Sequence, residues 1–371
     1  MAVVVIVNPT SGGRRGAAVL QQVLAAVPGP VAVRRTTRQG EAADIAGSVV
    51  SDGVEAGPVS TLVVIGGDGT LSEVVDGMMR THLQLDVPEA GVGAASWRVL
   101  GGAARLPRIV YCPAGTGADF ARLGLAVRPE QVPHAVASTE ATDVDVGYVR
   151  CVRSDCATLR FFINVASVGL GSAVVRRAEC LKRSWVAWLG GAVVFLLAAA
   201  IEVCIMATVR VSVTSTSVPM EGTPRQPAVS DDTYTTDATT MAFCNGRYFG
   251  GGMCISPEAS LTDRRLSVTV WRERVLGFAL GLLSIYSGRA AKWRSTSSFE
   301  TADALVAPAD AAAADGQRET GPVLPAAELA SIQFEVDGEL GCALPALVGV
   351  APVTVRFATV PAPGGSMSVS V

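Results

Sequence analysis

Apolar runs and helical patterns alternate along roughly the first 140 residues of the chain. Residues 2–7 are all apolar, as in a strand that is buried on both faces of a sheet. Strands are predicted at residues 2–7, 31–33, 62–65 and 109–112, and helices at 17–27, 42–50, 72–79 and 120–123. This alternation predicts a parallel α/β domain, in which ligands bind at the carboxyl ends of the strands.

Beyond residue 140 the pattern changes to short strand-like runs with few helical stretches between them. These runs are residues 143–149, 161–165, 209–214, 239–244, 266–271, 332–336 and 353–358. They predict a second, mostly antiparallel β-rich domain, which is a sandwich or a flattened barrel. The chain is therefore expected to divide into an α/β domain at 1–140, a β-rich domain at 141–360 and a tail at 361–371.

Three stretches interrupt these patterns. Residues 81–107 are rich in glycine and alanine and are predicted to form a surface insertion in the first domain. Residues 215–238 and 302–328 are rich in small, polar and proline residues, which favours loops. The first of these two loops is expected at the tip of a hairpin that joins 209–214 to 239–244.

One segment, from Ser184 to Ile201, carries no charge over 18 residues, which is near the lower limit for a membrane-spanning helix. Trp188 lies in its first half, and Lys182 and Arg183 precede it. We expect a helix that does not cross a membrane. Whether it is buried in the second domain or docks on a membrane surface stays open.

The bulk composition adds few constraints. The chain of 371 residues is 49% hydrophobic with a net charge of −3, so a large core is expected and a nucleic-acid-binding surface is not. Its eight cysteines form no CxxC pair, and two histidines are too few for a zinc site. Reduced thiols in a cytoplasmic protein are therefore expected.

Two glycine-rich turns follow strands of the first domain. The run Gly66-Gly67-Asp68-Gly69-Thr70 leads into a helix, and Glu73 is placed as in a capping box with Thr70. The run Pro113-Ala114-Gly115-Thr116-Gly117 leads to Asp119 and a second helix. Such turns offer backbone N–H groups to a phosphate. One alone is often a plain connection, but two in one domain favour a phosphate site.

Motifs along most of the chain together resemble the diacylglycerol kinase catalytic domain family of lipid kinases, which includes bacterial lipid kinases, sphingosine kinases and ceramide kinases. In chain order they are Asn8-Pro9-Thr10-Ser11-Gly12, Thr37 with Gly40-Glu41-Ala42, Gly66-Gly67-Asp68-Gly69-Thr70 with Glu73, Pro113-x-Gly115-Thr116-Gly117-x-Asp119-Phe120, Asn164-Val165-Ala166-Ser167-Val168-Gly169, Asn245-Gly246-x-x-Phe249-Gly250-Gly251-Gly252-Met253, Asp263 and Val336-Asp337-Gly338-Glu339. The resemblance implies an active site in the cleft between the two domains, where ATP and Mg²⁺ serve the phosphorylation of a lipid.

The resemblance also assigns roles to single residues. ATP is expected to bind Asn8, Pro9, Thr10, Thr37, Gly66, Gly67, Asp68, Gly69, Thr70, Glu73, Gly115 and Thr116. A carboxylate must accept the proton of the lipid hydroxyl. Glu339, in the run Asp337-Gly338-Glu339, is our first choice for this base, and Asp68 is the alternative. The resemblance also makes Asp337 a catalytic candidate. The Asp337-Gly338 pair is also typical of a plain hairpin turn.

Metal binding is expected at two places. The resemblance puts Asp119 and Asp68 at the magnesium ion of the nucleotide and Asp263 at a separate, structural magnesium ion. Two positions depart from the family pattern. Ala118 stands where asparagine is usual, and Arg264 stands where glycine is usual. Arg264 places a positive charge beside the proposed structural cation, which weighs against metal binding there.

The leading prediction is thus a cytoplasmic, peripherally membrane-associated lipid kinase whose substrate lies at a membrane surface. One alternative is an NAD kinase-like or phosphofructokinase-like enzyme, because these share a Gly-Gly-Asp-Gly turn. Another is a catalytically weak lipid- or nucleotide-binding protein, for which Ala118 and Arg264 are the argument. The sequence does not choose among acylglycerol, diacylglycerol, sphingosine and ceramide, and it leaves open whether the chain forms a homo-oligomer.

Overall fold

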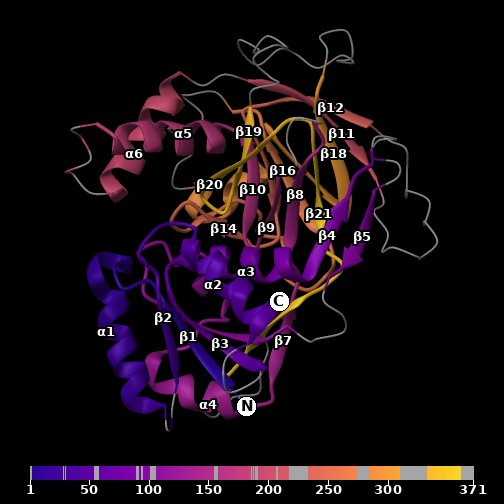
Figure 1. The fold of residues 1–371 in the computed structure, drawn as a ribbon. Coiled ribbons are helices and arrows are strands. Elements are labelled where there is room, and N and C mark those ends of the chain that lie inside the picture. The colour runs from indigo at the N-terminus through magenta and orange to yellow at the C-terminus, as the bar shows by residue number, and fades with distance from the viewer. Residues whose placement is uncertain are drawn as a thin grey trace.

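The computed structural model describes residues 2–360 with gaps and arranges them as two domains (Figure 1). The gaps are residues 28, 30, 54–57, 89–91, 93–94, 101–105, 154–157, 185, 187, 189–190, 206–207, 217–232, 274–283 and 310–331. The predicted tail at 361–371 lies outside the described residues.

The first domain is built on a six-stranded sheet with the order β2-β1-β3-β6-β22-β7. Its strands are β1 (Ala2–Val7), β2 (Ala32–Arg35), β3 (Val59–Gly66), β6 (Arg108–Pro113), β7 (Ala141–Val144) and β22 (Val355–Ala358). The strands from β2 to β22 pair in parallel, and β7 pairs antiparallel at the edge. The predicted parallel α/β domain is confirmed.

Helices cover both faces of this sheet because the side chains of each strand alternate between the faces. Val5 of β1 packs in the core beneath α1, and Val4 packs in the core beneath α2 and α3. The helices are α1 (Ser11–Ala26), α2 (Glu41–Asp52), α3 (Asp68–His82), α4 (Val132–Ala137) and the 3₁₀ helices η2 (Phe120–Leu123) and η3 (Pro129–Gln131).

The second domain is an antiparallel sandwich of two six-stranded sheets, as the short apolar runs predicted. One sheet contains β17 (Thr296–Thr301), β16 (Leu266–Trp271), β13 (Thr240–Cys244), β10 (Val165–Gly169), β19 (Gln333–Val336) and β20 (Glu339–Ala343). The other contains β12 (Thr233–Ala238), β11 (Val209–Ser215), β18 (Asp303–Pro308), β21 (Ala346–Val350), β8 (Gly147–Cys151) and β9 (Leu159–Phe162). A small ribbon of β14 (Tyr248–Phe249) and β15 (Met253–Cys254) and the 3₁₀ helix η5 (Arg289–Lys292) complete this domain.

Two strands that the pattern assigned to the second domain belong to the first sheet. β7 and β22 extend that sheet beyond β6, although both fall within the range 141–360 that was expected to be wholly β-rich. A short apolar run predicts a strand but carries no information about its partner. The chain consequently passes between the domains twice in its described part, after β7 and again before β22.

Two predicted loops contain strands. β12 pairs with β11, so the hairpin partner of 209–215 is 233–238, while the expected partner β13 lies in the opposite sheet. β18 falls in the range 302–328 that was predicted to be a loop, and it pairs with β11 and β21. Both strands are rich in threonine, aspartate or alanine, a composition that resembles a loop when it is considered alone.

The insertion predicted at 81–107 contains a hairpin of β4 (Leu83–Asp86) and β5 (Ser96–Val99). One face of this hairpin is buried rather than exposed. Trp97 is 1% exposed, and its ring makes an edge contact with the ring of Tyr148 in the second domain at a centroid distance of 4.8 Å. The insertion therefore helps to join the two domains.

Most of the apolar segment lies in α6 (Gly191–Cys204), which pairs with the preceding helix α5 (Leu170–Lys182) at the edge of the sandwich (Figure 1). Arg177 of α5 makes an ion pair with Glu202 of α6. Among the described residues no helix has both the length and the apolar character needed to span a bilayer.

Candidate active site

Three turns of the first domain meet at the carboxyl ends of β1, β3 and β6. The backbone N–H of Asn8 donates to the carbonyl of Ile65 at 2.9 Å, which ties the first turn to the second. The Asn8 side chain lies 3.4 Å from the hydroxyl of Thr70 and accepts hydrogen bonds from the backbone and hydroxyl of Thr10. The predicted nucleotide residues Asn8, Thr10 and Thr70 are thus neighbours.

Glycine is required where these turns approach one another. A Cβ atom on Gly115 would lie 2.5 Å from Cα of Gly67, and one on Gly12 would lie 2.1 Å from the carbonyl oxygen of Ala114. Gly12 also has a φ of 57°, which few other residues adopt. The backbones of the three turns therefore form a close-packed wall without side chains, which suits a phosphate ligand.

Asp68 begins α3 and holds the third turn in place. Its carboxylate accepts hydrogen bonds from the backbone N–H groups of Asp119 at 2.9 Å and Phe120 at 3.1 Å. These N–H groups open the 3₁₀ helix η2, whose free donors favour a negative charge. Asp68 therefore positions Asp119 beside the turn wall.

Asp119 fits a bound cation. Its side chain is buried, one carboxylate oxygen accepts the N–H of Gly251 at 2.9 Å, and the other has no hydrogen-bond partner within the described structure. Burial raises the pKa of Asp119 to about 6, and the charge of Asp68 adds to that rise. Within the described part no group of three or more acidic, His or Cys side chains forms a metal site, but Mg²⁺ commonly uses one or two carboxylates with substrate phosphates.

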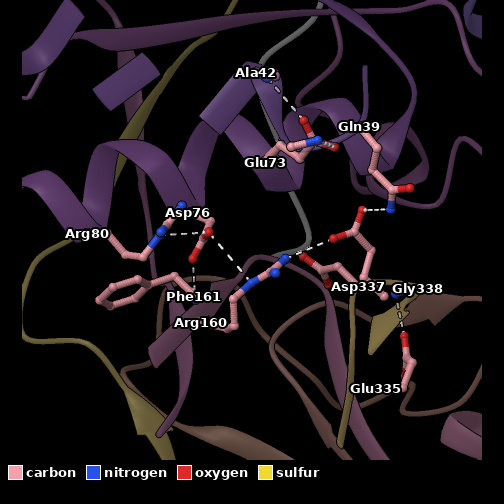
Figure 2. Close-up of polar contacts among 12 residues, drawn as sticks. Gln39, Ala42, Glu73, Asp76, Arg80, Arg160, Phe161, Glu335, Asp337 and Gly338 are labelled. Carbon is pink, nitrogen blue, oxygen red and sulfur yellow. Dashed lines mark hydrogen bonds and ion pairs between the residues drawn. The ribbon is translucent and has the colours of Figure 1, made fainter. Parts of the chain in front are cut away.

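Glu73 has a different role from the one that its spacing predicted. Thr70 lies inside α3 rather than at its cap, so the predicted capping box is absent. The Glu73 carboxylate instead accepts the N–H groups of Gly40 at 2.9 Å and Ala42 at 3.2 Å, which cap the start of α2 (Figure 2). Burial raises the pKa of Glu73, and the nearby Glu339 contributes to that rise.

The Asp337-Gly338 pair forms the two-residue turn of the β19–β20 hairpin. Val336 pairs with Glu339, and both central residues have positive φ, 48° and 90°, as a type I′ turn requires. The carboxylate of Asp337 accepts three backbone N–H groups, from residues 163, 164 and 165. These bonds fix the position of Asp337 in the turn, and its predicted catalytic role stays a prediction.

The turn directs Glu339 toward the first domain. Its carboxylate accepts a hydrogen bond from Gln39 at 2.7 Å and lies 3.0 Å from the guanidinium of Arg160. Arg160 in turn lies 3.6 Å from Asp76 of α3, which Arg80 also pairs at 3.0 Å (Figure 2). Burial raises the pKa of Asp76, and the two arginines oppose that shift. Glu339 is therefore held between the domains.

Glu335 lies beneath this turn and is fully buried in the sandwich. It accepts a hydrogen bond from the N–H of Gly338 (Figure 2) and another from the hydroxyl of Ser167 at 2.7 Å. Burial raises the pKa of Glu335 to about 7 despite these two donors. The position of the turn, and with it Glu339, depends on this buried acid.

Two predicted threonines lie at the edges of these groups, and Asp263 lies apart from them. Thr37 and Thr116 are exposed, and the Thr37 backbone and hydroxyl both donate to Glu41. Asp263 makes no described hydrogen bond to Asp119. Its carboxylate accepts the N–H of Arg265 at 3.0 Å. The turns that contain Pro9, Gly66 and Gly69 follow β1 and β3, at the strand ends where the sequence predicted them.

Sequence reasoning missed Gln39, Arg160, Asp76 and Glu335. Asp76 carried one usable signal, because it is an acid between the apolar pairs Val74-Val75 and Met78-Met79 of α3; in the structure it is 2% exposed. The other three had no local signal. Gln39 and Glu339 are 300 positions apart in the chain, so only the fold reveals their contact.

Comparison with known proteins agrees with this arrangement. Residues 2–149 match the diacylglycerol kinase catalytic domain, and residues 165–359 match the YegS C-terminal NAD kinase beta sandwich-like domain. The chain is 29% identical over 242 residues to a protein of Xanthomonas euvesicatoria named "Probable lipid kinase YegS-like", covering 64% of this chain and 63% of that one. A protein of the same name from Pseudomonas aeruginosa is also 29% identical, covering 65% and 62%.

These alignments span less than two thirds of the relatives' own length. A crystal structure of a diacylglycerol kinase from Bacillus anthracis has the same fold, with a TM-score of 0.57 at 16% identity and coverage of 97% of both chains. At this identity the likeness concerns the fold alone.

Proposed function

The chain belongs to the family that joins a diacylglycerol kinase catalytic domain to a YegS C-terminal domain, and from this premise we propose that it is a lipid kinase. It transfers the γ-phosphate of ATP, in a Mg²⁺-dependent reaction, to a hydroxyl group of diacylglycerol or a sphingoid lipid. The names of the curated relatives support the lipid as acceptor.

The observation that carries the proposal is the wall of glycine turns beside Asp119. The close approach of Gly67 and Gly115 leaves backbone without side chains at the carboxyl ends of two parallel strands, where ligands of such sheets bind. Asn8 and Thr70 border this wall with polar side chains. Phosphoryl transfer needs such a cradle, because its catalysis consists mainly of positioning and electrostatic stabilisation.

Asp119 is the residue that would hold the metal ion, with Asp68 beside it. Its unpartnered carboxylate oxygen and its raised pKa both fit a site that a cation completes. Magnesium supplies, when bound, the positive charge that stabilises the phosphate oxygens during transfer. Asp68 already accepts two backbone N–H groups, so in this proposal it orients Asp119 and η2.

Glu339 is then the base. It lies on the turn that faces α3, its side chain is 24% exposed, and Arg160 and Gln39 orient its carboxylate from two sides. A carboxylate in such a position accepts the proton of the lipid hydroxyl as the oxygen attacks phosphorus. Asp68 remains the alternative base, and substitution of Glu339 distinguishes between the two residues in this role.

The lipid substrate implies contact with a membrane, and α6 offers a surface for it. Trp188, Val193 and Leu197 are 74%, 47% and 38% exposed, and the last two lie on one side of α6 because they are four positions apart. Exposed Lys182 and Arg183 precede this surface. Apolar side chains beside basic ones are typical of helices that lie in a membrane interface.

Radiolabelled ATP and a panel of acceptors test the proposed function. The purified chain is incubated with Mg²⁺ and micelles that contain monoacylglycerol, diacylglycerol, sphingosine or ceramide, with NAD as a separate acceptor. We expect labelled phosphate in one lipid and none in NAD. Label in NAD and in no lipid would overturn the proposal, and nucleotide binding without transfer to any acceptor would favour a binding protein.

A further inference from the structure

The chain crosses between the two domains at two neighbouring places. Asp145 and Val146 lie between β7 of the first sheet and β8 of the sandwich, and residues 351–354 lie between β21 and β22. The N–H of Ala351 donates to the carbonyl of Val146 at 2.8 Å, so the two crossings are in contact. The two connections between the domains therefore run side by side at this place.

Arg264 contacts both crossings at once. Its backbone N–H and its guanidinium donate to the two carboxylate oxygens of Asp145, at 2.6 and 3.1 Å. A second guanidinium nitrogen donates to the carbonyl of Ala351 at 2.8 Å. We call this group of Arg264, Asp145 and Ala351 the hinge clamp.

The carboxylate of Asp145 needs a positive partner. Its side chain is 1% exposed, whereas that of Arg264 is 45% exposed. A buried carboxylate without a cation carries a large desolvation penalty, which the ion pair with one guanidinium nitrogen and the hydrogen bond from the backbone N–H offset together. Asp145 also accepts through its backbone carbonyl the side-chain amide of Asn245 and donates its N–H to the carbonyl of Leu261, so its position is fixed.

The backbone of Arg264 is in a conformation that favours glycine. Its φ is 62°, and the resemblance of the sequence places glycine at this position. An arginine here is therefore strained relative to glycine. The ion pair between the Arg264 guanidinium and Asp145 offsets the free energy of this strain.

We propose that the guanidinium of Arg264 is the built-in cation of the interdomain hinge and that it takes the place of the structural divalent ion expected beside Asp263. The residues present do not fit such an ion. The carboxylate oxygens of Asp145 are bonded to Arg264, and the carboxylate of Asp263 is bonded to the N–H of Arg265. This inference is independent of which acceptor the enzyme phosphorylates.

Thermal unfolding of the full chain without nucleotide tests the clamp. Arg264→Gly suits the backbone but removes the guanidinium, and we expect its Tm in EDTA to fall by about 5 °C. The matched control is Arg265→Gly, because Arg265 is adjacent, its side chain is 56% exposed, and it pairs with the exposed Glu300. Its Tm should change by less than about 1 °C.

A second variant keeps the proposal falsifiable if Arg264→Gly does not fold. Arg264→Lys retains one charge but cannot reach Asp145 and Ala351 together, so its Tm should lie between those of the wild type and Arg264→Gly. Equal Tm values for Arg264→Lys and the wild type, or equal losses for Arg264→Gly and Arg265→Gly, would overturn the clamp.

Metal dependence is tested separately. Mg²⁺ or Ca²⁺ can shift the Tm of the nucleotide-free wild type by binding at Asp119 as well as beside Asp263. The Tm shift of the wild type is therefore compared with that of Asp263→Asn, which retains Asp119. We expect the same shift in both proteins, because no ion binds beside Asp263. A shift that Asp263→Asn abolishes would show a divalent ion at this site and would overturn the replacement by Arg264.

Discussion

Arg160 joins Glu339 of the sandwich to Asp76 of α3, with its guanidinium 3.0 Å from the first carboxylate and 3.6 Å from the second. The side chains of Arg160 and Glu339 are 25% and 24% exposed, whereas that of Asp76 is 3% exposed. Arg160 thus positions the proposed base Glu339, and the buried Asp76 of α3 in turn anchors Arg160. The two domains are coupled at the site of the expected chemistry.

Glu339→Gln is expected to lower kcat on the preferred lipid by at least about 100-fold while KM for ATP stays close to the wild-type value. The amide has nearly the shape of the carboxylate but cannot accept a proton. Steady-state phosphate transfer measures the effect. Glu300→Gln is the control, because Glu300 is an exposed acid paired with Arg265. Near-wild-type turnover of Glu339→Gln would transfer the role of base to Asp68.

Gly115→Ala is expected to lower Tm by about 4 °C and to weaken ATP binding, because the new methyl group would lie 2.5 Å from Cα of Gly67. Gly69→Ala is the comparison for stability. No atom lies within 4 Å of its added Cβ, and alanine favours the helix, so its Tm should stay equal or rise. Thermal unfolding and ATP titration distinguish the variants. Equal Tm losses for both would contradict the close approach of the two turns.

Local patterns predicted much of the fold. The apolar runs at 2–7 and 62–65 became β1 and β3, and the turns after β3 and β6 lie side by side because parallel strands end at one edge of a sheet. Each strand and helix of this alternation is recognisable from the pattern of residues that are close together in the sequence. This is why the α/β domain was predictable from the sequence alone.

Long-range partners were not predictable in this way. β7 and β22 are short strands of four residues, and nothing in their sequences indicates that β22 pairs with β6 and β7 with β22 rather than within the sandwich. Glu73 had the spacing of a capping box with Thr70. It caps α2 instead, because the N–H groups of Gly40 and Ala42 at the start of α2 donate to its carboxylate. Tertiary contacts replaced the local one.

Ala118→Asn is expected to raise Tm by about 2 °C and to leave turnover unchanged. Ala118 has a φ of 56°, where alanine is strained by about 1 kcal/mol and asparagine is tolerated better. Thermal unfolding and the transfer assay measure both effects. Ala121→Asn, in the following 3₁₀ helix, should not stabilise the protein. A loss of activity in Ala118→Asn would mean that the departure from the family pattern has a functional reason.

Glu335→Gln is expected to stabilise the protein at pH 8 but not at pH 4.5. Burial raises the pKa of Glu335 from 4.5 to about 7, so the folded protein keeps a proton that the unfolded chain releases between these values. Stability is therefore lost as pH rises through this window, by up to about 3 kcal/mol. The amide has no such proton. Denaturant unfolding at both pH values measures the difference, with the exposed Glu258→Gln as control. A gain that is equal at the two pH values would contradict the raised pKa.

Trp188→Ser with Leu197→Ser is expected to weaken binding to anionic vesicles by roughly tenfold or more, since two exposed apolar side chains would no longer enter the interface. Flotation with vesicles that contain phosphatidylglycerol measures the partition coefficient. Tyr286→Ser is the matched control, because Tyr286 is 49% exposed but does not belong to the α5–α6 pair. Activity on a lipid presented in detergent micelles should change less than activity on vesicles. Unaltered flotation of the double variant would show that α6 is not the docking surface, and an equal loss in Tyr286→Ser would show that the effect is one of general surface hydrophobicity.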